Sequence, residues 1–201
     1  YSNENIFNEE LINIFYENWL CVGRSNDIKN EGNYITFQIG NESVIIIRND
    51  KNKLNGFFNV CRHRGTRICI DEKGSFSKTM QCKYHGWTYN LNGSLVGAPN
   101  MDNVDDFNKN DYPLHSVLLK EWNGFIFICL SDNPERFENF YKPLNDKFNE
   151  WQLSKLKTIE QKDYIIKANW KLVIQNFNEC YHCPTIHPDL AKIHHFTSGE
   201  N

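Results

Sequence analysis

Long apolar runs and a strong charge of either sign are both missing from this chain of 201 residues. No stretch approaches the roughly 18 apolar residues that cross a bilayer, and no basic-then-apolar leader opens the sequence, so we expect neither a membrane span nor a signal peptide. The formal net charge is only −3, which argues against a nucleic-acid-binding surface and a polyanionic tail. With 40% hydrophobic and 14% aromatic residues, the composition predicts one or two globular domains with a sizeable core.

The chain has seven cysteines, an odd number. Because no secretory leader is visible, they are predicted to be reduced thiols in a cytoplasmic protein rather than a disulfide framework. Cys61 and Cys82 are set apart from the rest because they belong to the pair of Cys-His motifs described below. The others are Cys21, Cys69, Cys129, Cys180 and Cys183.

Short β-branched and aromatic runs, bounded by Asn, Gly and Asp, dominate the first two thirds of the chain. They predict strands at residues 19–22, 34–39, 43–47, 54–60, 87–90, 94–96, 113–119 and 124–130. Asn92-Gly93 predicts a two-residue hairpin turn, and the last two runs are expected to return to the same sheet. An approximate helical period over residues 3–17 predicts a helix before this β-rich region.

The pattern changes at Asn133-Pro134. Residues 134–150 are typical of polar helix, and residues 157–168 predict a long strand in a second domain. We therefore expect an N-terminal helix at 1–17, a β-rich domain at 18–132 and the beginning of a second domain at 133–201. The expected fold class is α+β.

Two Cys-His pairs, C-x-H and C-x2-H, form the most specific motif of the chain. Cys61 and His63 make the first pair, and Cys82 and His85 make the second, 18 residues further on. Thiolate and imidazole together suit either a structural zinc or a 2Fe-2S cluster with two cysteines on one iron and two histidines on the other. Zinc sites usually pair Cys with Cys and His with His, whereas each pair here is mixed, which favours the cluster. Three glycines are expected to let the loops turn closely around it: Gly65, Gly74 and Gly86.

A second constellation lies in residues 169–187. Trp170, Val173, Ile174, Phe177 and Tyr181 follow a helical spacing and predict a stripe that faces a core. Gln175, Glu179 and His182 gather on the opposite side of the same helix. His187 is rotated from His182 by roughly 140° in a straight helix, so both rings reach one ion only if the helix breaks. Pro184 is expected to supply that break.

Taken alone, the H-x4-H spacing of His182 and His187 is weak evidence, because solvated or core histidines are common. A broken helix between them is nevertheless a way to build half of an iron site with two histidines and one carboxylate. Cys180 and Cys183 are open to three interpretations: a redox dithiol, part of a zinc site, or structural packing, of which packing is favoured. His194 and His195 are predicted to lie on a solvated helix face.

The stretches 59–65, 82–89 and 91–99 resemble the cluster site of Rieske-type oxygenase alpha subunits. In one departure, the gap between His63 and Cys82 is slightly longer than is usual in that family. Residues 176–188 resemble the mononuclear-iron helix of the same family. Together these resemblances span nearly the whole chain.

The resemblance implies a Rieske 2Fe-2S cluster on Cys61, His63, Cys82 and His85, and a mononuclear Fe(II) on His182 and His187. It implies that Glu179 is the catalytic bridging carboxylate, which accepts a hydrogen bond from a cluster histidine of an adjacent subunit, by position His85. The family's third iron ligand, an Asp well downstream, is not in this sequence. Glu in place of Asp at the bridging position is more like members that act on quaternary ammonium compounds such as choline, betaine or carnitine.

The function so implied is that of a terminal oxygenase component. A flavin- or ferredoxin-containing, NAD(P)H-linked reductase would supply electrons through the cluster to the iron, which hydroxylates or demethylates an organic substrate with O2. The expected assembly is a homotrimer or an α3β3 complex, with no nucleic-acid or membrane partner. One alternative is a Rieske ferredoxin, an electron carrier without oxygenase activity. The other is a zinc-stabilised binding module.

Overall fold

The structure of the chain is a computed structural model, and it describes residues 1–193. His194 and His195 therefore lie outside the described residues. Contacts divide the chain into two units, one of residues 8–160 and one that combines residues 1–7 with the segment from 161 onward. Each unit is described by itself. No helix of the described residues is both long and apolar enough to cross a membrane.

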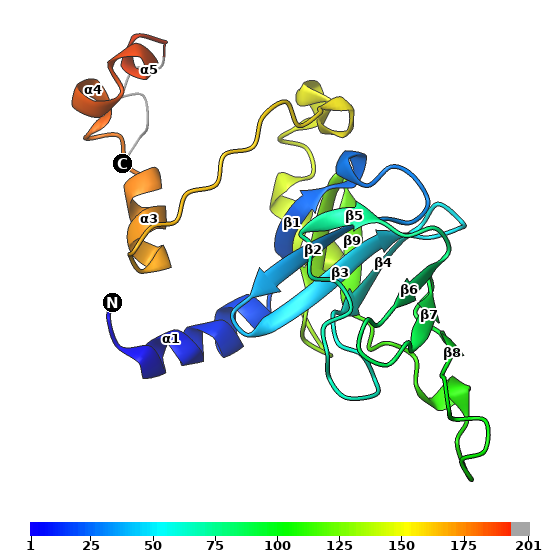
Figure 1. The fold of residues 1–201 in the computed structure, drawn as a ribbon. Coiled ribbons are helices and arrows are strands. Elements are labelled where there is room, and N and C mark those ends of the chain that lie inside the picture. Colours follow the sequence, from blue (N-terminus) through cyan, green and yellow to red (C-terminus); the bar gives the residue numbers. More distant parts are fainter. Residues whose placement is uncertain (194–201) are drawn as a thin grey trace. The chain divides into compact units, whose positions relative to one another are not determined.

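A four-stranded antiparallel sheet forms the middle layer of the larger unit (Figure 1). Its order is β4-β3-β2-β5, with β2 at Asn33–Ile39, β3 at Glu42–Arg48, β4 at Leu54–Phe58 and β5 at Lys73–Ser75. The central strand β3 reads Val44-Ile45-Ile46-Ile47, and all four side chains are fully buried. Val44 and Ile46 enter one core while Ile45 and Ile47 enter another. The continuous apolar run thus belongs to a strand that is covered on both faces.

Two three-stranded sheets provide those covers. One has the order β1-β10-β9, with β1 at Leu20–Arg24, β9 at Leu118–Trp122 and β10 at Phe125–Cys129. Ile126 and Ile128 of β10 pack in the core with Val44 and Ile46. The strand predicted at residues 113–119 begins later, at Leu118, and pairs with the one predicted at 124–130. These two strands do not return to the sheet of the strands predicted at 87–90 and 94–96, so that part of the prediction is wrong. Alternation identifies a strand with a buried face, but it does not say which sheet the strand joins.

The other cover has the order β6-β7-β8, with β6 at Thr79–Gln81, β7 at Thr88–Asn90 and β8 at Leu95–Gly97. Its hairpin is confirmed, but the turn is one residue longer than expected. The Asn90 amide donates to the Ser94 carbonyl, so Leu91, Asn92 and Gly93 form the loop. Gly93 has a φ of +84°, which suits a three-residue hairpin loop with glycine in the left-handed region.

Helical segments precede and follow the strands along the chain. The predicted N-terminal helix is confirmed as α1, Glu4–Glu10, continued by a π-helical stretch η1, Leu11–Tyr16. Short 3-10 turns lie in the connections, η2 at Ser25–Asp27 and η3 at Lys109–Asp111. After the last strand come α2 at Phe137–Tyr141, η4 at Lys142–Leu144, η5 at Asn149–Trp151 and η6 at Leu153–Lys155. The helical character predicted for residues 134–150 is thus confirmed, in short pieces.

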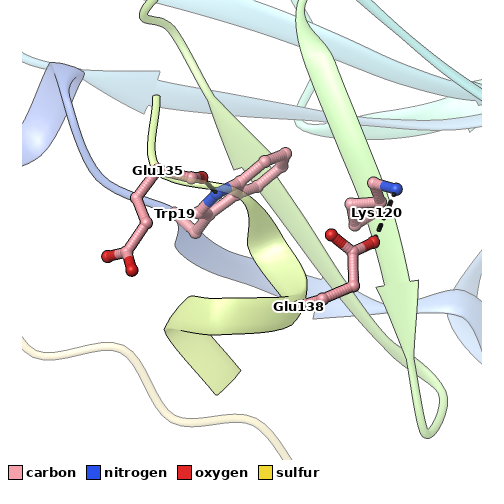
Figure 2. A network of polar contacts seen from close by, with 4 residues as sticks. All are labelled: Trp19, Lys120, Glu135 and Glu138. Carbon is pink, nitrogen blue, oxygen red and sulfur yellow. Dashed lines mark hydrogen bonds and ion pairs between the residues drawn. The ribbon is translucent and has the colours of Figure 1, made fainter. Parts of the chain in front are cut away.

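Helix α2 is held against the strands by aromatic contacts of Phe137 and Tyr141 and by two polar contacts nearby, which Figure 2 shows. The rings of Trp19 and Phe137 meet edge to face with centroids 5.1 Å apart. The Trp19 indole N–H donates to the Glu135 carbonyl at 2.8 Å, and Lys120 forms an ion pair with Glu138 at 3.2 Å. Residues 137–141 therefore pack on the β-rich unit, and the domain boundary near residue 132 stays a prediction.

The smaller unit is helical. It contains α3 at Trp170–Phe177, α4 at Cys183–Ile186 and α5 at Pro188–Ile193. The strand predicted for residues 157–168 is wrong, because this stretch has no regular structure and pairs with no described strand. Apolar residues can favour an extended backbone, but a strand forms only beside a hydrogen-bonding neighbour.

Helix α3 ends earlier than predicted, and Pro184 is not the cause. The helix stops at Phe177, and Glu179 accepts the Tyr181 amide through Oε2 at 2.5 Å. A side chain thereby takes a backbone donor that a continuing helix would have used. Pro184 instead lies in the first turn of α4, where a missing N–H is tolerated. The predicted break between the two histidines is therefore wrong: the helix is interrupted before His182, and His182 and His187 flank the short helix α4.

The apolar stripe of α3 is not covered by the described residues. Phe177 is 83% and Tyr181 is 93% exposed, so the prediction that this face meets a core is contradicted within residues 1–193. The helix begins as the sequence suggests, since the Asn169 side chain accepts the Lys171 amide at 3.1 Å as an N-cap.

Candidate metal centres

The two Cys-His loops have the same backbone design. In the first, the Gly65 amide donates to the Cys61 carbonyl, and in the second the Gly86 amide donates to the Cys82 carbonyl, both at 3.0 Å. In each loop, the backbone amide of the cysteine also donates to the carbonyl of the residue five positions later. That residue is Thr66 in the first loop and Trp87 in the second. Residues 61–65 follow β4, and residues 82–86 connect β6 to β7. Two strands of different sheets thus each present one mixed Cys-His pair.

Glycine closes each loop because the chain there is left-handed. Gly65 and Gly86 both have a φ of +72°, a conformation that disfavours any side chain. Gly74, the third glycine singled out from the sequence, does something else. It lies in β5, where a Cβ atom would come within 2.7 Å of the Tyr34 hydroxyl. The expectation that Gly74 eases a loop around the cluster is therefore wrong, and close packing against Tyr34 explains the residue.

The two predicted histidine ligands lie side by side, and so do the two predicted cysteine ligands. The rings of His63 and His85 lie 4.7 Å apart between centroids, at an interplanar angle of 76°. The Cys61 and Cys82 thiols are neighbours, since burial and the nearby Cys82 thiol together raise the pKa of Cys61, and both residues are 2% exposed. No three His, Cys, Asp or Glu side chains converge on one point within the described residues. A cluster of two irons needs only two protein ligands for each metal, a cysteine pair and a histidine pair.

His63 has the chemical character of a metal ligand. Its Nδ1 is buried without a hydrogen-bond partner among the described residues, and burial, followed by the nearby His85 and Arg64, lowers the pKa of the ring. A neutral imidazole with one free nitrogen is what iron requires. The ring is held by stacking on Trp87, with centroids 4.9 Å apart at 11°. His85 is exposed, with the Tyr84 ring beside it at 3.8 Å.

Tyr89 supports the first cysteine, a role that sequence reasoning missed. Its ring is fully buried, and its hydroxyl lies 3.4 Å from the Cys61 sulfur and 3.0 Å from the Arg62 amide. The amide donates to the hydroxyl oxygen, which leaves the hydroxyl hydrogen for a deprotonated sulfur. Burial raises the pKa of the Cys61 thiol and of the Tyr89 hydroxyl, so the tyrosine stays a donor. A buried tyrosine needs a partner, but the sequence does not say which.

Asn59 holds the rest of the first loop and was also missed. It is 1% exposed. Its Oδ1 accepts the Ile68 and Cys69 amides at 3.0 and 2.9 Å, and its Nδ2 donates to the Cys69 carbonyl and the Ser43 hydroxyl at 2.7 and 3.1 Å. One side chain thereby ties the far end of the loop to β3. An asparagine beside a cysteine motif gives no sign of this, because all its partners are backbone or distant in sequence.

The second constellation is also brought together, within the smaller unit. The His182 and His187 rings lie 5.4 Å apart between centroids, at 73°. Glu179 Oε1 is 2.5 Å from His182 Nδ1. The hydrogen bond from His182 is the main reason that the pKa of Glu179 is lowered, so the carboxylate is ionised at neutral pH. A carboxylate on Nδ1 fixes the tautomer of His182 and leaves Nε2 free for a metal.

Family profiles match both parts of the chain. The Rieske [2Fe-2S] domain matches residues 18–108, and the catalytic domain of the ring-hydroxylating alpha subunit matches residues 153–201. Among similar proteins is the glycine betaine monooxygenase oxygenase subunit of Chromohalobacter salexigens, 39% identical over 96% of this chain and 43% of its own length. The carnitine monooxygenase oxygenase subunit of Escherichia coli is 35% identical over 95% of this chain and 51% of its length. The chain thus spans about half the length of these relatives.

Solved structures agree with the profiles. A quaternary ammonium Rieske monooxygenase in complex with L-carnitine superposes with a TM-score of 0.87 at 32% identity, covering 94% of this chain and 54% of the other. Naphthalene 1,2-dioxygenase superposes with a TM-score of 0.80 at 28% identity, covering 96% of this chain and 44% of the other. The α+β fold expected from the sequence is confirmed. The chain belongs to the family of Rieske-type non-heme iron oxygenase alpha subunits.

Proposed function

We propose that the protein is the terminal oxygenase component of a system that hydroxylates or demethylates a small organic compound with O2. The observation that carries this is the pairing of two like-built loops, which bring Cys61 to Cys82 and His63 to His85. The second support is the group of Glu179, His182 and His187 in the part of the chain that matches the catalytic domain. A ferredoxin-type carrier explains the first group but has no use for the second.

The residues present fit the two metal groups that the family carries. Cys61, Cys82, His63 and His85 would hold the 2Fe-2S cluster, and the unpartnered Nδ1 of His63 supports this. His182 and His187 would provide two ligands of the mononuclear iron. When bound, the two groups supply one-electron storage and oxygen activation. The protein's own part is to hold His182 in one tautomer through Glu179, to keep Cys61 and Cys82 away from water, and to leave His85 at the surface.

For the substrate, we propose a quaternary ammonium compound. Two observations support it. The relatives from Chromohalobacter salexigens and Escherichia coli described above are named for glycine betaine and carnitine, and the chain has Glu rather than Asp at position 179. The measurement is substrate-dependent O2 uptake by the complete protein with glycine betaine, carnitine and naphthalene compared side by side. Uptake coupled to naphthalene alone would contradict the assignment.

For partners, we propose an NAD(P)H-linked reductase and a trimer of alpha subunits, in the cytoplasm. Inter-subunit electron transfer has been described for a quaternary ammonium Rieske monooxygenase of similar structure, and the exposed ring of His85 is compatible with a carboxylate from a neighbouring subunit. The carboxylate proposed for that contact is Glu179, which would link His85 of one subunit to His182 of the next.

Spectroscopy of the anaerobically purified complete protein tests the metal assignment. We expect visible absorption, a paramagnetic 2Fe-2S signal after reduction, and a third iron beyond the two of the cluster. Cys82→Ala should abolish the signal, because a thiolate ligand is lost, while Cys21→Ala, which removes an exposed cysteine, should leave it unchanged. His182→Ala should remove the third iron only. A colourless protein that contains zinc would refute the cluster, and two irons in place of three would favour the ferredoxin alternative.

Replacing Tyr89 by Phe is predicted to lower the reduction potential of the cluster without removing it. A donor to a cluster sulfur stabilises the more negative, reduced state. Loss of roughly 1 kcal/mol from that hydrogen bond corresponds to about 40 mV for one electron. The measurement is a spectroscopic redox titration, with Tyr84→Phe as the control, since that ring lies beside His85 rather than a sulfur. A potential equal to that of the unaltered protein would show that the Tyr89 hydroxyl does not donate to Cys61.

A further inference from the structure

Cys180 and Cys183 form a chemical motif of the smaller unit that the proposed function leaves unused. They flank His182 at a spacing of C-x2-C. Both are free thiols, Cys180 half-buried and Cys183 buried. The neighbouring Cys180 thiol is the main reason that the pKa of the Cys183 thiol is raised. The two thiols are therefore neighbours.

The backbone between them is set for a disulfide. The Cys183 amide donates to the Cys180 carbonyl at 3.0 Å, which closes a turn of four residues. Such a turn keeps its first and last Cα atoms within about 7 Å, and disulfides span Cα separations of roughly 4.4 to 6.8 Å. Closing the bond thus requires rotation of two side chains rather than movement of the chain. His182, the proposed iron ligand, is the third residue of this turn.

We propose that Cys180 and Cys183 form a redox dithiol that a hydroperoxide converts reversibly into a disulfide beside the iron site. The half-buried Cys180 meets the oxidant, and the buried Cys183 resolves the product. This assignment rests on the proposed function only for the source of the oxidant. An oxygen-activating iron site that has no substrate to oxidise would supply it, because two-electron reduction of O2 gives hydrogen peroxide. The dithiol itself requires no metal.

The chemistry balances with peroxide as the sole oxidant. The Cys180 sulfur attacks one peroxide oxygen, the O–O bond breaks, and a sulfenic acid and one water result. The Cys183 sulfur then attacks the Cys180 sulfur, the S–S bond forms, and the second water leaves. Two thiols lose two electrons and two protons, and the peroxide takes up both to become two waters. A thiol reductant reverses the reaction.

The test is peptide mapping of the metal-loaded protein after treatment with stoichiometric hydrogen peroxide and thiol alkylation. We expect one peptide containing both cysteines to become lighter by two hydrogens and to resist alkylation until dithiothreitol is added. With Cys180→Ser the linkage should be absent, and with Cys183→Ser a sulfenic acid should be trapped by dimedone on Cys180. Cys21, exposed but without a neighbouring thiol in the described residues, is the internal comparison.

Two outcomes would overturn the proposal. In one, Cys180 and Cys183 are both still alkylated at a peroxide dose that has oxidised Cys21. In the other, the oxidised pair is not restored by dithiothreitol. The visible spectrum of the same sample separates this result from the proposed function, because a linked dithiol without a cluster signal would refute only the cluster, and a cluster signal without the linkage would refute only the dithiol.

Discussion

Replacing Glu179 by Gln is expected to stop turnover while both metal groups stay bound. The carboxylate accepts from His182 Nδ1 through one oxygen and from the Tyr181 amide through the other, each at 2.5 Å. Glutamine keeps an oxygen as acceptor, so the tautomer of His182 and the iron site survive. It loses the negative charge and cannot accept on both sides. If Glu179 links two subunits, the path for electrons from His85 is broken at this residue.

The measurements are iron content, the reduced cluster signal and single-turnover oxidation of the iron by O2 in the complete protein. We expect three irons, an unchanged cluster signal, and a loss of turnover of about 100-fold, the upper end of the range over which outer-shell partners of metal ligands act. Asp189→Asn is the matched control, because it also removes one carboxylate charge from the same unit. Within the described residues, that carboxylate forms its ion pair with the exposed Lys192. Unchanged turnover in the Glu179 variant would rule out the bridging role.

The parts of the fold that sequence reasoning predicted are those in which a local pattern has one interpretation. The run Val44-Ile45-Ile46-Ile47 identifies a strand, and its burial on both faces explains why no polar residue interrupts it. The sequence could not predict which strands share a sheet, since residues 124–130 have the same apolar pattern whichever sheet they join. Segment 157–168 was wrongly predicted to be a strand, because its composition is typical of strands but no partner strand pairs with it in the described residues.

The candidate site divides in the same way. Spacing was enough to select Cys61, His63, Cys82 and His85, because ligand identity is a property of the side chains themselves. Tyr89 acts through contacts with residues 27 and 28 positions before it, and Asn59 through contacts with residues 9 and 10 positions after it. Nothing in a single sequence marks such partners. For Pro184 both the place and the cause of the predicted break were wrong: the helix is interrupted before His182, where the Glu179 side chain accepts the Tyr181 amide.

Replacing Asn59 by Leu is expected to have the largest effect on folding of any single change outside the ligands. Leucine has nearly the same size and is apolar, so it creates no cavity. It leaves the Ile68 and Cys69 amides, the Cys69 carbonyl and the Ser43 hydroxyl buried without their partner. Each orphaned group costs roughly 1–3 kcal/mol. Because the four share one loop, the losses do not simply add, and we expect about 3–5 kcal/mol.

The loss should be concentrated in the first ligand loop, since Asn59 is what ties residues 68 and 69 to β3. We therefore expect faster hydrogen exchange at the Ile68 and Cys69 amides, and a cluster content well below that of the unaltered protein, as His63 is no longer held opposite His85. Asn108→Ala is the control: that exposed asparagine accepts a single amide, from Asn110, and should cost under about 1 kcal/mol. Full cluster content with unchanged exchange in Asn59→Leu would mean that Cys61 and its loop are positioned by the metal group alone, and that the protein scaffold does not preorganise the site.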